Sequence, residues 1–217
     1  MFRGETGTLE PHPHFLRPAP GVKYEARSEP GVKPQGYISR TESISACSNA
    51  GKRLCSVSEW YAACSGSRHT TYPYGPKYEK RVCNVSRPHL LTKFFGSNAR
   101  AWKYDEHFNN PKLNQLQGWL ANTGAFAGCT SDYGVSDMVG NLHEWVADQA
   151  SAEAVREVPL RPEIRRALVP HRSGRGVFMG GFYSTGSEHG DGCTFVTMAH
   201  EPSYHDYSTG FRCCKDL

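Results

Sequence analysis

Residues 180–217 read GGFYSTGSEHGDGCTFVTMAHEPSYHDYSTGFRCCKDL and join a double glycine to a cysteine-rich end. Two earlier stretches complete the pattern: AGKRLCSVSEWYAAC at residues 50–64 and DYGVSDMVGNLHEWVAD at residues 132–148. Each short motif is a weak signal by itself. Their combination, in this order, indicates a single fold that contains paired cysteines and a segment in which a glycine precedes a tryptophan, VGNLHEW at residues 139–145.

Two short helices are predicted on either side of the GKRL motif, and each begins with a capping box. Ser39 with Glu42 starts the first helix, which ends at Gly51, and Ser56 with Glu59 starts the second. In a capping box each of the two side chains binds a backbone N–H that the helix leaves unpaired. The sequence therefore predicts where both helices begin.

The rest of the chain is predicted to be mostly loop, with three short strands. Residues 1–36 contain six prolines, which oppose regular helix and favour an extended N-terminal segment ahead of a domain at residues 37–217. Residues 150–175, rich in Arg and Pro, are expected to form an inserted loop. Its arginines suit either a solvated loop, the favoured interpretation, or contact with an acidic partner. The expected strands are residues 176–182, 192–197 and 209–214.

The composition excludes several classes of protein. The 217 residues suffice for one domain, or at most two, with a real core. A net charge of +4 without a basic cluster argues against nucleic-acid binding. No stretch reaches the roughly 18 consecutive apolar residues of a membrane span, and the first residues lack the apolar run of a secretory signal.

The cysteines indicate the compartment. There are eight, an even number, dispersed without the paired C-x-x-C spacing of zinc sites. This usage predicts disulfides and an extracytoplasmic location, meaning secreted, periplasmic or envelope. Buried free thiols in a cytosolic protein are the less favoured alternative.

In its motifs the chain resembles the formylglycine-generating enzyme (sulfatase-modifying factor) family over roughly residues 35–217. The resemblance implies an α+β, C-type-lectin-like fold with two short helices, a small antiparallel sheet and many ordered loops. It also implies the disulfides Cys47–Cys213 and Cys64–Cys193.

Four cysteines have no counterpart in the family pattern. Neighbouring residues on a strand face opposite sides, so Cys214 is expected to point away from Cys213 and to reach Cys55. Cys83 and Cys129 then remain for each other. Four disulfides and no free thiol are the expected result.

The resemblance also implies that two residues needed for the family's reaction are missing here. Enzymes of this family carry two reactive cysteines that bind copper(I), and the matching positions here fall near Thr185 and Glu188. Neither is a soft ligand of the kind that copper(I) needs. Related sulfoxide synthases use iron held by three histidines. His189, His200 and His205 are candidates for such a group, although a chance grouping is favoured. Copper and iron are therefore disfavoured, and whether the chain is an enzyme stays open.

Calcium is the expected ion. The family places structural calcium at a VGNxxEW segment, matched here by Val139, Gly140, Asn141, Leu142 and Glu144, and hard oxygen donors on an irregular loop suit Ca²⁺. Asn84 and Val85 are the candidate start of a second site. The alternative is that Glu144 caps a turn without metal.

A non-catalytic module that recognises a small ligand, a glycan or a protein is the favoured function. An oxidoreductase with a non-standard metal site and a structural domain of an envelope assembly are the alternatives. The predicted pocket residues are the loop aromatics and the side chains near the missing cysteine pair: Trp102, Trp119, Tyr183, Thr185, Glu188, His189, His200 and His205.

Overall fold

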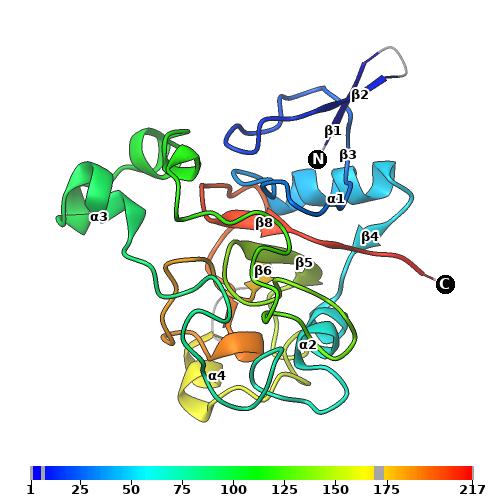
Figure 1. Cartoon of the computed structure of the whole chain (residues 1–217), viewed down its shortest axis with the longest axis vertical. Helices are drawn as coiled ribbons and strands as arrows, with labels where there is room; N and C mark the ends of the chain where they lie inside the picture. The colour runs from blue at the N-terminus through cyan, green and yellow to red at the C-terminus, as the bar shows by residue number, and fades with distance from the viewer. Residues whose placement is uncertain (1, 6–7, 169–173, 217) are drawn as a thin grey trace.

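The centre of the molecule is a four-stranded sheet in the order β7-β6-β5-β8. Figure 1 labels three of these strands, β5, β6 and β8. The structure is a computed structural model and describes residues 2–5, 8–168 and 174–216. Strands β5 and β8 run parallel, whereas β6 is antiparallel to β5 and to β7. The four strands are β5 (His143–Gln149), β6 (Gly176–Met179), β7 (Val196–Thr197) and β8 (Thr209–Phe211).

Both predicted helices are present, and both capping boxes are confirmed. Helix α1 (Arg40–Asn49) begins after Ser39, whose hydroxyl accepts the Glu42 N–H while the Glu42 carboxylate accepts the Ser39 N–H. Helix α2 (Val57–Ser65) repeats the arrangement. Both helices contact β5, so the two caps fix where the helices meet the sheet.

Several shorter elements surround this centre. Strand β4 (Arg53–Leu54) pairs with β9 (Cys213–Cys214), and β1 (Phe2–Glu5) lies between β2 (Thr8–Pro11) and β3 (Tyr24–Glu25). The remaining elements are α3 (Leu90–Phe95), α4 (Pro162–Leu168), 3₁₀ turns at Ala99–Ala101, Leu113–Gln115 and Gly192–Thr194, and a π turn at Tyr104–Phe108.

The N-terminal segment, predicted to be extended, contacts the domain along much of its length. The Ala26 N–H donates to Ala46 in α1, and the Thr123 N–H donates to Val32. Arg17 forms an ion pair with Glu42 at 2.8 Å.

The expected strands are shorter in the structure, and the inserted loop contains a helix. Residues 192–194 form a 3₁₀ turn before β7, and residue 212 separates β8 from β9. Within residues 150–175, expected to form an inserted loop, the structure has the short helix α4. Its first residue is Pro162, whose fixed φ suits a helix start, and Ile164 and Leu168 bury one face. Part of the loop, residues 169–173, lies outside the described residues.

Four disulfides link the termini of these elements, in the pairs that the sequence predicts. Two tie strand β9 to α1 and to the α1–α2 connection, one ties α2 to the 3₁₀ turn at Gly192, and one closes the loop before the VGNLHEW segment. They are Cys47–Cys213, Cys55–Cys214, Cys64–Cys193 and Cys83–Cys129. Removing a native disulfide of this kind costs about 2–5 kcal/mol. The four bonds together favour an oxidising extracellular or lumenal compartment.

Across the described part of the chain, no helix has the length and apolarity needed to cross a membrane.

Candidate ligand-binding site

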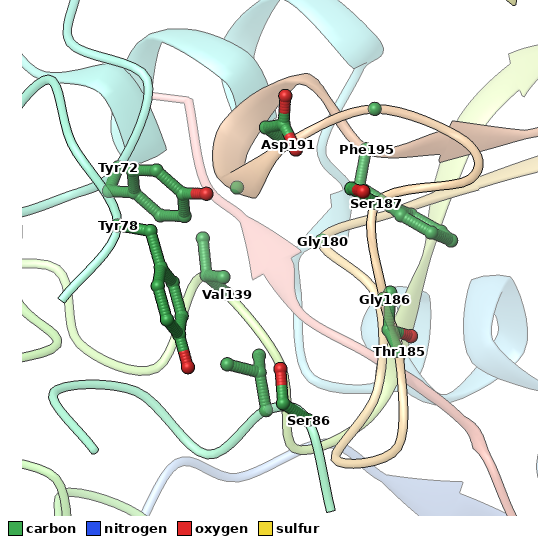
Figure 2. A pocket seen from close by; sticks show the side chains of 13 residues that line it. Tyr72, Tyr78, Ser86, Val139, Gly180, Thr185, Gly186, Ser187, Asp191 and Phe195 are labelled. Atoms are coloured by element: carbon green, nitrogen blue, oxygen red, sulfur yellow. The ribbon is translucent and has the colours of Figure 1, made fainter. Parts of the chain in front are cut away.

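A cavity of about 300 Å³ opens between the segment after α2 and the loop that follows β6. Figure 2 shows the two tyrosines on one side, the loop side chains on the other and Val139 between them. The lining combines aromatic rings with hydroxyl groups and one carboxylate. The side chains that give it this character are those of Tyr72, Tyr78, Ser86, Thr185, Ser187 and Asp191.

Glycines allow the two walls to approach closely. Gly192 has a φ of +53°, and a Cβ there would stand 2.7 Å from a ring carbon of Tyr72 and would collide with the Thr71 carbonyl. The Cys193 N–H donates to the same carbonyl at 2.8 Å. Because Cys193 is also bonded to Cys64 of α2, the Asp191–Cys193 turn is held against the tyrosine segment.

The tyrosines form a small aromatic group. Tyr74 stacks on Tyr72 with ring centroids 5.5 Å apart, and Tyr78 lies 6.0 Å from Tyr72 at an interplanar angle of 57°. Burial, followed by the negative charge of Asp191, raises the pKa of Tyr72 to about 12. Tyr72 is thus a neutral hydrogen-bonding phenol near a carboxylate at physiological pH.

Of the predicted pocket residues, Thr185 lines this cavity. Glu188 and His189 lie on the same loop but are exposed and do not line it. Tyr78, Ser86 and Asp191 also line the cavity but were not predicted to do so. The tyrosine-rich YPYGPKY run could have indicated Tyr78, and the GDGC run could have indicated Asp191, whereas no sequence signal marks Ser86.

Three aromatic residues that were predicted to line the pocket do not line this cavity. Trp102, Trp119 and Tyr183 pack in a separate hydrophobic cluster with Leu90 and Tyr207. Tyr183 is fully buried because the chain turns inward after two glycines with positive φ, at residues 180 and 181. The indole of Trp119 donates to the Pro88 carbonyl, and that of Trp102 donates to Gly96, so both are satisfied by the protein.

The three candidate iron ligands do not come together. His200 stacks on Tyr204 at 3.8 Å, His205 lies beside Tyr104, and His189 contacts the edge of Phe195. Over the residues with described positions, no group of three or more His, Cys, Asp or Glu is placed to hold a metal.

The two residues predicted to match the family's copper ligands, Thr185 and Glu188, carry no thiol. Thr185 carries a hydroxyl, the Glu188 carboxylate is exposed, and each of the eight cysteines is in a disulfide. Copper(I) requires soft thiolate or thioether donors, so these residues do not fit the ion.

Glu144 is anchored by protein donors. Its Oε2 accepts the indole N–H of Trp60 at 2.6 Å and the Arg212 Nε–H at 2.6 Å, and its Oε1 accepts from Arg212 Nη2 at 2.8 Å. Burial lowers the pKa of Arg212, but the charge and the hydrogen bonds of Glu144, together with the charge of Asp137, raise it by more, so the net shift is upward. The predicted calcium residue is therefore one half of a bidentate ion pair.

The neighbouring asparagines cross-link the backbone. Asn84 Nδ2 donates to Asn141 Oδ1 at 2.8 Å, and the Ala121 N–H donates to the same oxygen at 2.8 Å. Asn141 has a φ of +63°, a conformation that Asn tolerates better than most residues. These contacts hold the VGNLHEW turn against residues 84 and 121.

A second carboxylate, Asp137, lies within electrostatic range of this pair. Burial raises its pKa, whereas Arg212 lowers it and Glu144 raises it. Two carboxylates and one arginine leave one negative charge and hard oxygen donors. The donor types fit calcium, although Arg212 and Trp60 already donate three hydrogen bonds to the roughly four acceptor positions of the Glu144 carboxylate.

Comparison with known proteins identifies the family to which the chain belongs. The sulfatase-modifying factor enzyme 1-like domain matches residues 14–217. Two mammalian proteins named inactive C-alpha-formylglycine-generating enzyme 2 are similar. The one from Bos taurus is 28% identical over 55% of this chain and 34% of its own, and the one from Mus musculus is 24% identical over 64% and 42%. The formylglycine-generating enzyme of Mus musculus is 27% identical over 53% of this chain and 27% of its own.

The chain therefore spans less than half the length of these curated relatives. The structure of PvdO from Pseudomonas aeruginosa has the same fold, with a TM-score of 0.56 at 16% identity over 91% of this chain and 73% of that one. With the family match covering almost the whole sequence, the chain belongs to the formylglycine-generating enzyme (sulfatase-modifying factor) family.

Proposed function

We propose that this domain is a non-catalytic recognition module that binds a ligand in the cavity between Tyr72 and Asp191. The observation that carries the proposal is the state of the cysteines. All eight are in disulfides, and the loop that would supply the copper thiolates presents Thr185 and Ser187 to the cavity. What remains is a rigid cavity with aromatic walls and a few polar groups, the usual character of a binding pocket.

The names of two similar proteins, both called inactive, support this proposal. The ligand would be a small molecule, a glycan or a segment of a protein, each small enough to place one group in about 300 Å³. The disulfides support a secreted, periplasmic or envelope location.

The test is a pocket-filling substitution combined with a ligand screen. Ser187 is exposed at the cavity wall, so Ser187→Tyr should fill the cavity without disturbing the core. We expect wild-type protein to bind members of a panel of amines, saccharides and short peptides in a thermal-shift and NMR screen. Ser187→Tyr should weaken that binding by at least about tenfold, or 1.4 kcal/mol.

The matched control is Ser97→Tyr, which adds the same ring at an exposed site beside α3. It should leave every affinity unchanged. If no panel member binds the wild type, or if Ser187→Tyr binds as well as Ser97→Tyr, the cavity is not a recognition site. Turnover of a bound ligand would instead favour an enzyme.

We also propose that calcium binds at the VGNLHEW turn, with Glu144 as its carboxylate ligand and carbonyl oxygens of residues 139–142 as further donors. The net negative charge of Asp137, Glu144 and Arg212 supports the proposal. A second calcium at Asn84 and Val85 has less support, because the Asn84 Oδ1 accepts from Arg87 and the Asn84 carbonyl accepts from Asn141.

Removal of calcium should therefore lower the melting temperature of the wild type. An ion at about 100 times its Kd stabilises the folded state by about 2.7 kcal/mol, or roughly 5–10 °C for a domain of this size. Scanning calorimetry with and without EDTA measures the effect. Glu144→Gln should lose the response to EDTA, whereas the exposed control Glu106→Gln should keep it. A wild-type melting temperature that EDTA does not change would exclude the site.

A further inference from the structure

We propose that the cavity selects a cationic group, an alkylammonium or a guanidinium, carried by a small molecule or by a peptide side chain. The inference rests on the proposed ligand-binding function and adds the chemical class of the ligand. It depends on three features of the site: the tilted tyrosines, the single carboxylate and the rigid link between them.

The tyrosines supply two aromatic walls. Tyr72 and Tyr78 meet at 57° with centroids 6.0 Å apart, and Phe195 lies on the opposite side (Figure 2). Rings set at such an angle around a small space suit a cation, because the ring face carries negative electrostatic potential. Tyr74 stacks on Tyr72 and limits the movement of its ring.

The carboxylate supplies the counter-charge. Among the described residues that line the cavity, Asp191 is the one with a charged side chain, and none of them is Lys, Arg or His. The whole chain has a net charge of +4, so a cavity with a net negative charge departs from the rest of the molecule. Arg161 binds the Ser187 carbonyl at 2.9 Å but is not part of the lining.

The link between these groups makes the site preorganised. Asp191 lies one residue from Gly192 and two from Cys193, which is joined to α2 by a disulfide and to Thr71 by a backbone hydrogen bond. Tyr72 directly follows Thr71, so carboxylate and ring are held together before any ligand arrives. Such a site spends little binding energy on ordering itself.

The experiment compares peptides that differ only in charge. The probes are Ac-Gly-Lys-Gly-NH₂, its Nε-acetylated form, Ac-Gly-Arg-Gly-NH₂, tetramethylammonium and N-acetylglucosamine, with affinities measured by NMR titration. We expect wild-type protein to bind the lysine or arginine peptide at least about tenfold more tightly than the acetylated peptide. Binding should weaken as salt rises, since a cation and a partly exposed carboxylate are screened.

Variants then identify the residues. Asp191→Asn should lower the affinity for the cationic probes by about tenfold, whereas Glu106→Gln, which removes an exposed carboxylate that does not line the cavity, should not change it. Tyr78→Leu should weaken binding several-fold, and Tyr78→Phe, which keeps the ring, should not. If only peptides bind, the cation belongs to a side chain. If tetramethylammonium binds equally well, it belongs to a free ligand.

The outcomes separate the inference from the proposed function. If the acetylated peptide or N-acetylglucosamine binds as tightly as the cations and Ser187→Tyr blocks it, the cavity is a binding site but not a cation site. The same conclusion follows if Asp191→Asn, shown to be folded by its circular dichroism, binds cations normally. If no probe binds, cationic or neutral, both the inference and the recognition function fail.

Discussion

Replacing Arg212 by methionine should destabilise the protein by about 2–4 kcal/mol and lower its melting temperature by roughly 5–15 °C. The side chain of Arg212 is 24% exposed and that of Glu144 is 12% exposed. In calcium-free protein that lacks the guanidinium, the largely buried carboxylate would keep the Trp60 indole as a donor but lose its counter-charge. An uncompensated buried charge costs more than the pair itself contributes.

The prediction is tested by chemical unfolding of Arg212→Met alongside Arg53→Met. Arg53 also forms bidentate contacts, with Glu59 and Asp216, but its pair lies at the surface. Water and salt screen such a pair, so its loss should change the unfolding free energy little. The double variant Glu144→Gln with Arg212→Met should be more stable than the sum of the single changes predicts. Equal effects of the two arginine substitutions would contradict a structural role for the Glu144 pair.

This ion pair also illustrates what the sequence could predict. The VGNLHEW segment identifies Glu144 as important, and the GFRC motif contains Arg212, but nothing in their spacing shows that they meet. Parallel pairing of β5 with β8 places Glu144 opposite Gly210, two residues from Arg212. Contact between segments so far apart in the chain depends on sheet topology, which local patterns do not encode.

Features that depend on residues close together in the sequence were predictable. Both capping boxes need only residues three apart, and they are confirmed at Ser39 and Ser56. The Cys55–Cys214 bond spans 159 residues, and its prediction needed the family resemblance to pair Cys213 with Cys47 before side-chain alternation along the strand could direct Cys214 to Cys55. By contrast, the tryptophans were predicted to line the pocket from their residue type and the histidines from their closeness in the sequence, but Trp119 and His200 contact other residues in the fold.

The cavity itself depends on long-range structure. Tyr72 and Asp191 come from segments on either side of the β5–β6 hairpin, and a disulfide brings them together. A loop glycine such as Gly192 becomes informative only when the ring that lies against it is known. The family resemblance indicated the loop, but which of its side chains line a cavity could be seen only in three dimensions.

Replacing His143 by leucine should make the protein markedly more resistant to acid. His143 is 8% exposed, and its Nδ1 has no hydrogen-bond partner among the described residues. Its ring packs against three phenylalanines at centroid distances of 4.5, 5.0 and 5.3 Å, namely Phe178, Phe182 and Phe195. Burial, with smaller effects from His200 and His189, lowers the pKa of His143 to about 3.

The direction follows from proton binding in the two states. In the unfolded chain His143 takes up a proton near its ordinary pKa of 6.5, whereas in the folded protein it does so only near 3. Between these values the unfolded state binds more protons, so stability is complete above pH 6.5 and declines as the pH falls toward 3. At pH 4.5 the loss from this residue is about 3 kcal/mol.

Unfolding free energies at pH 7.5 and pH 4.5 measure this loss, and the leucine variant should show a decrease about 3 kcal/mol smaller than the wild type. Burial also lowers the pKa values of His14 and His89. Both residues are present in the wild type and in the variant, so their contributions to the loss of unfolding free energy cancel in the comparison. The exposed His69, at a φ of +50° that Asn tolerates, provides the control His69→Asn, which should retain the wild-type pH dependence. If the leucine variant loses as much stability in acid as this control, protonation of His143 is not what limits the fold. A smaller loss of unfolding free energy in the leucine variant would instead identify His143 and the three phenylalanines around it as the acid-sensitive part of the molecule.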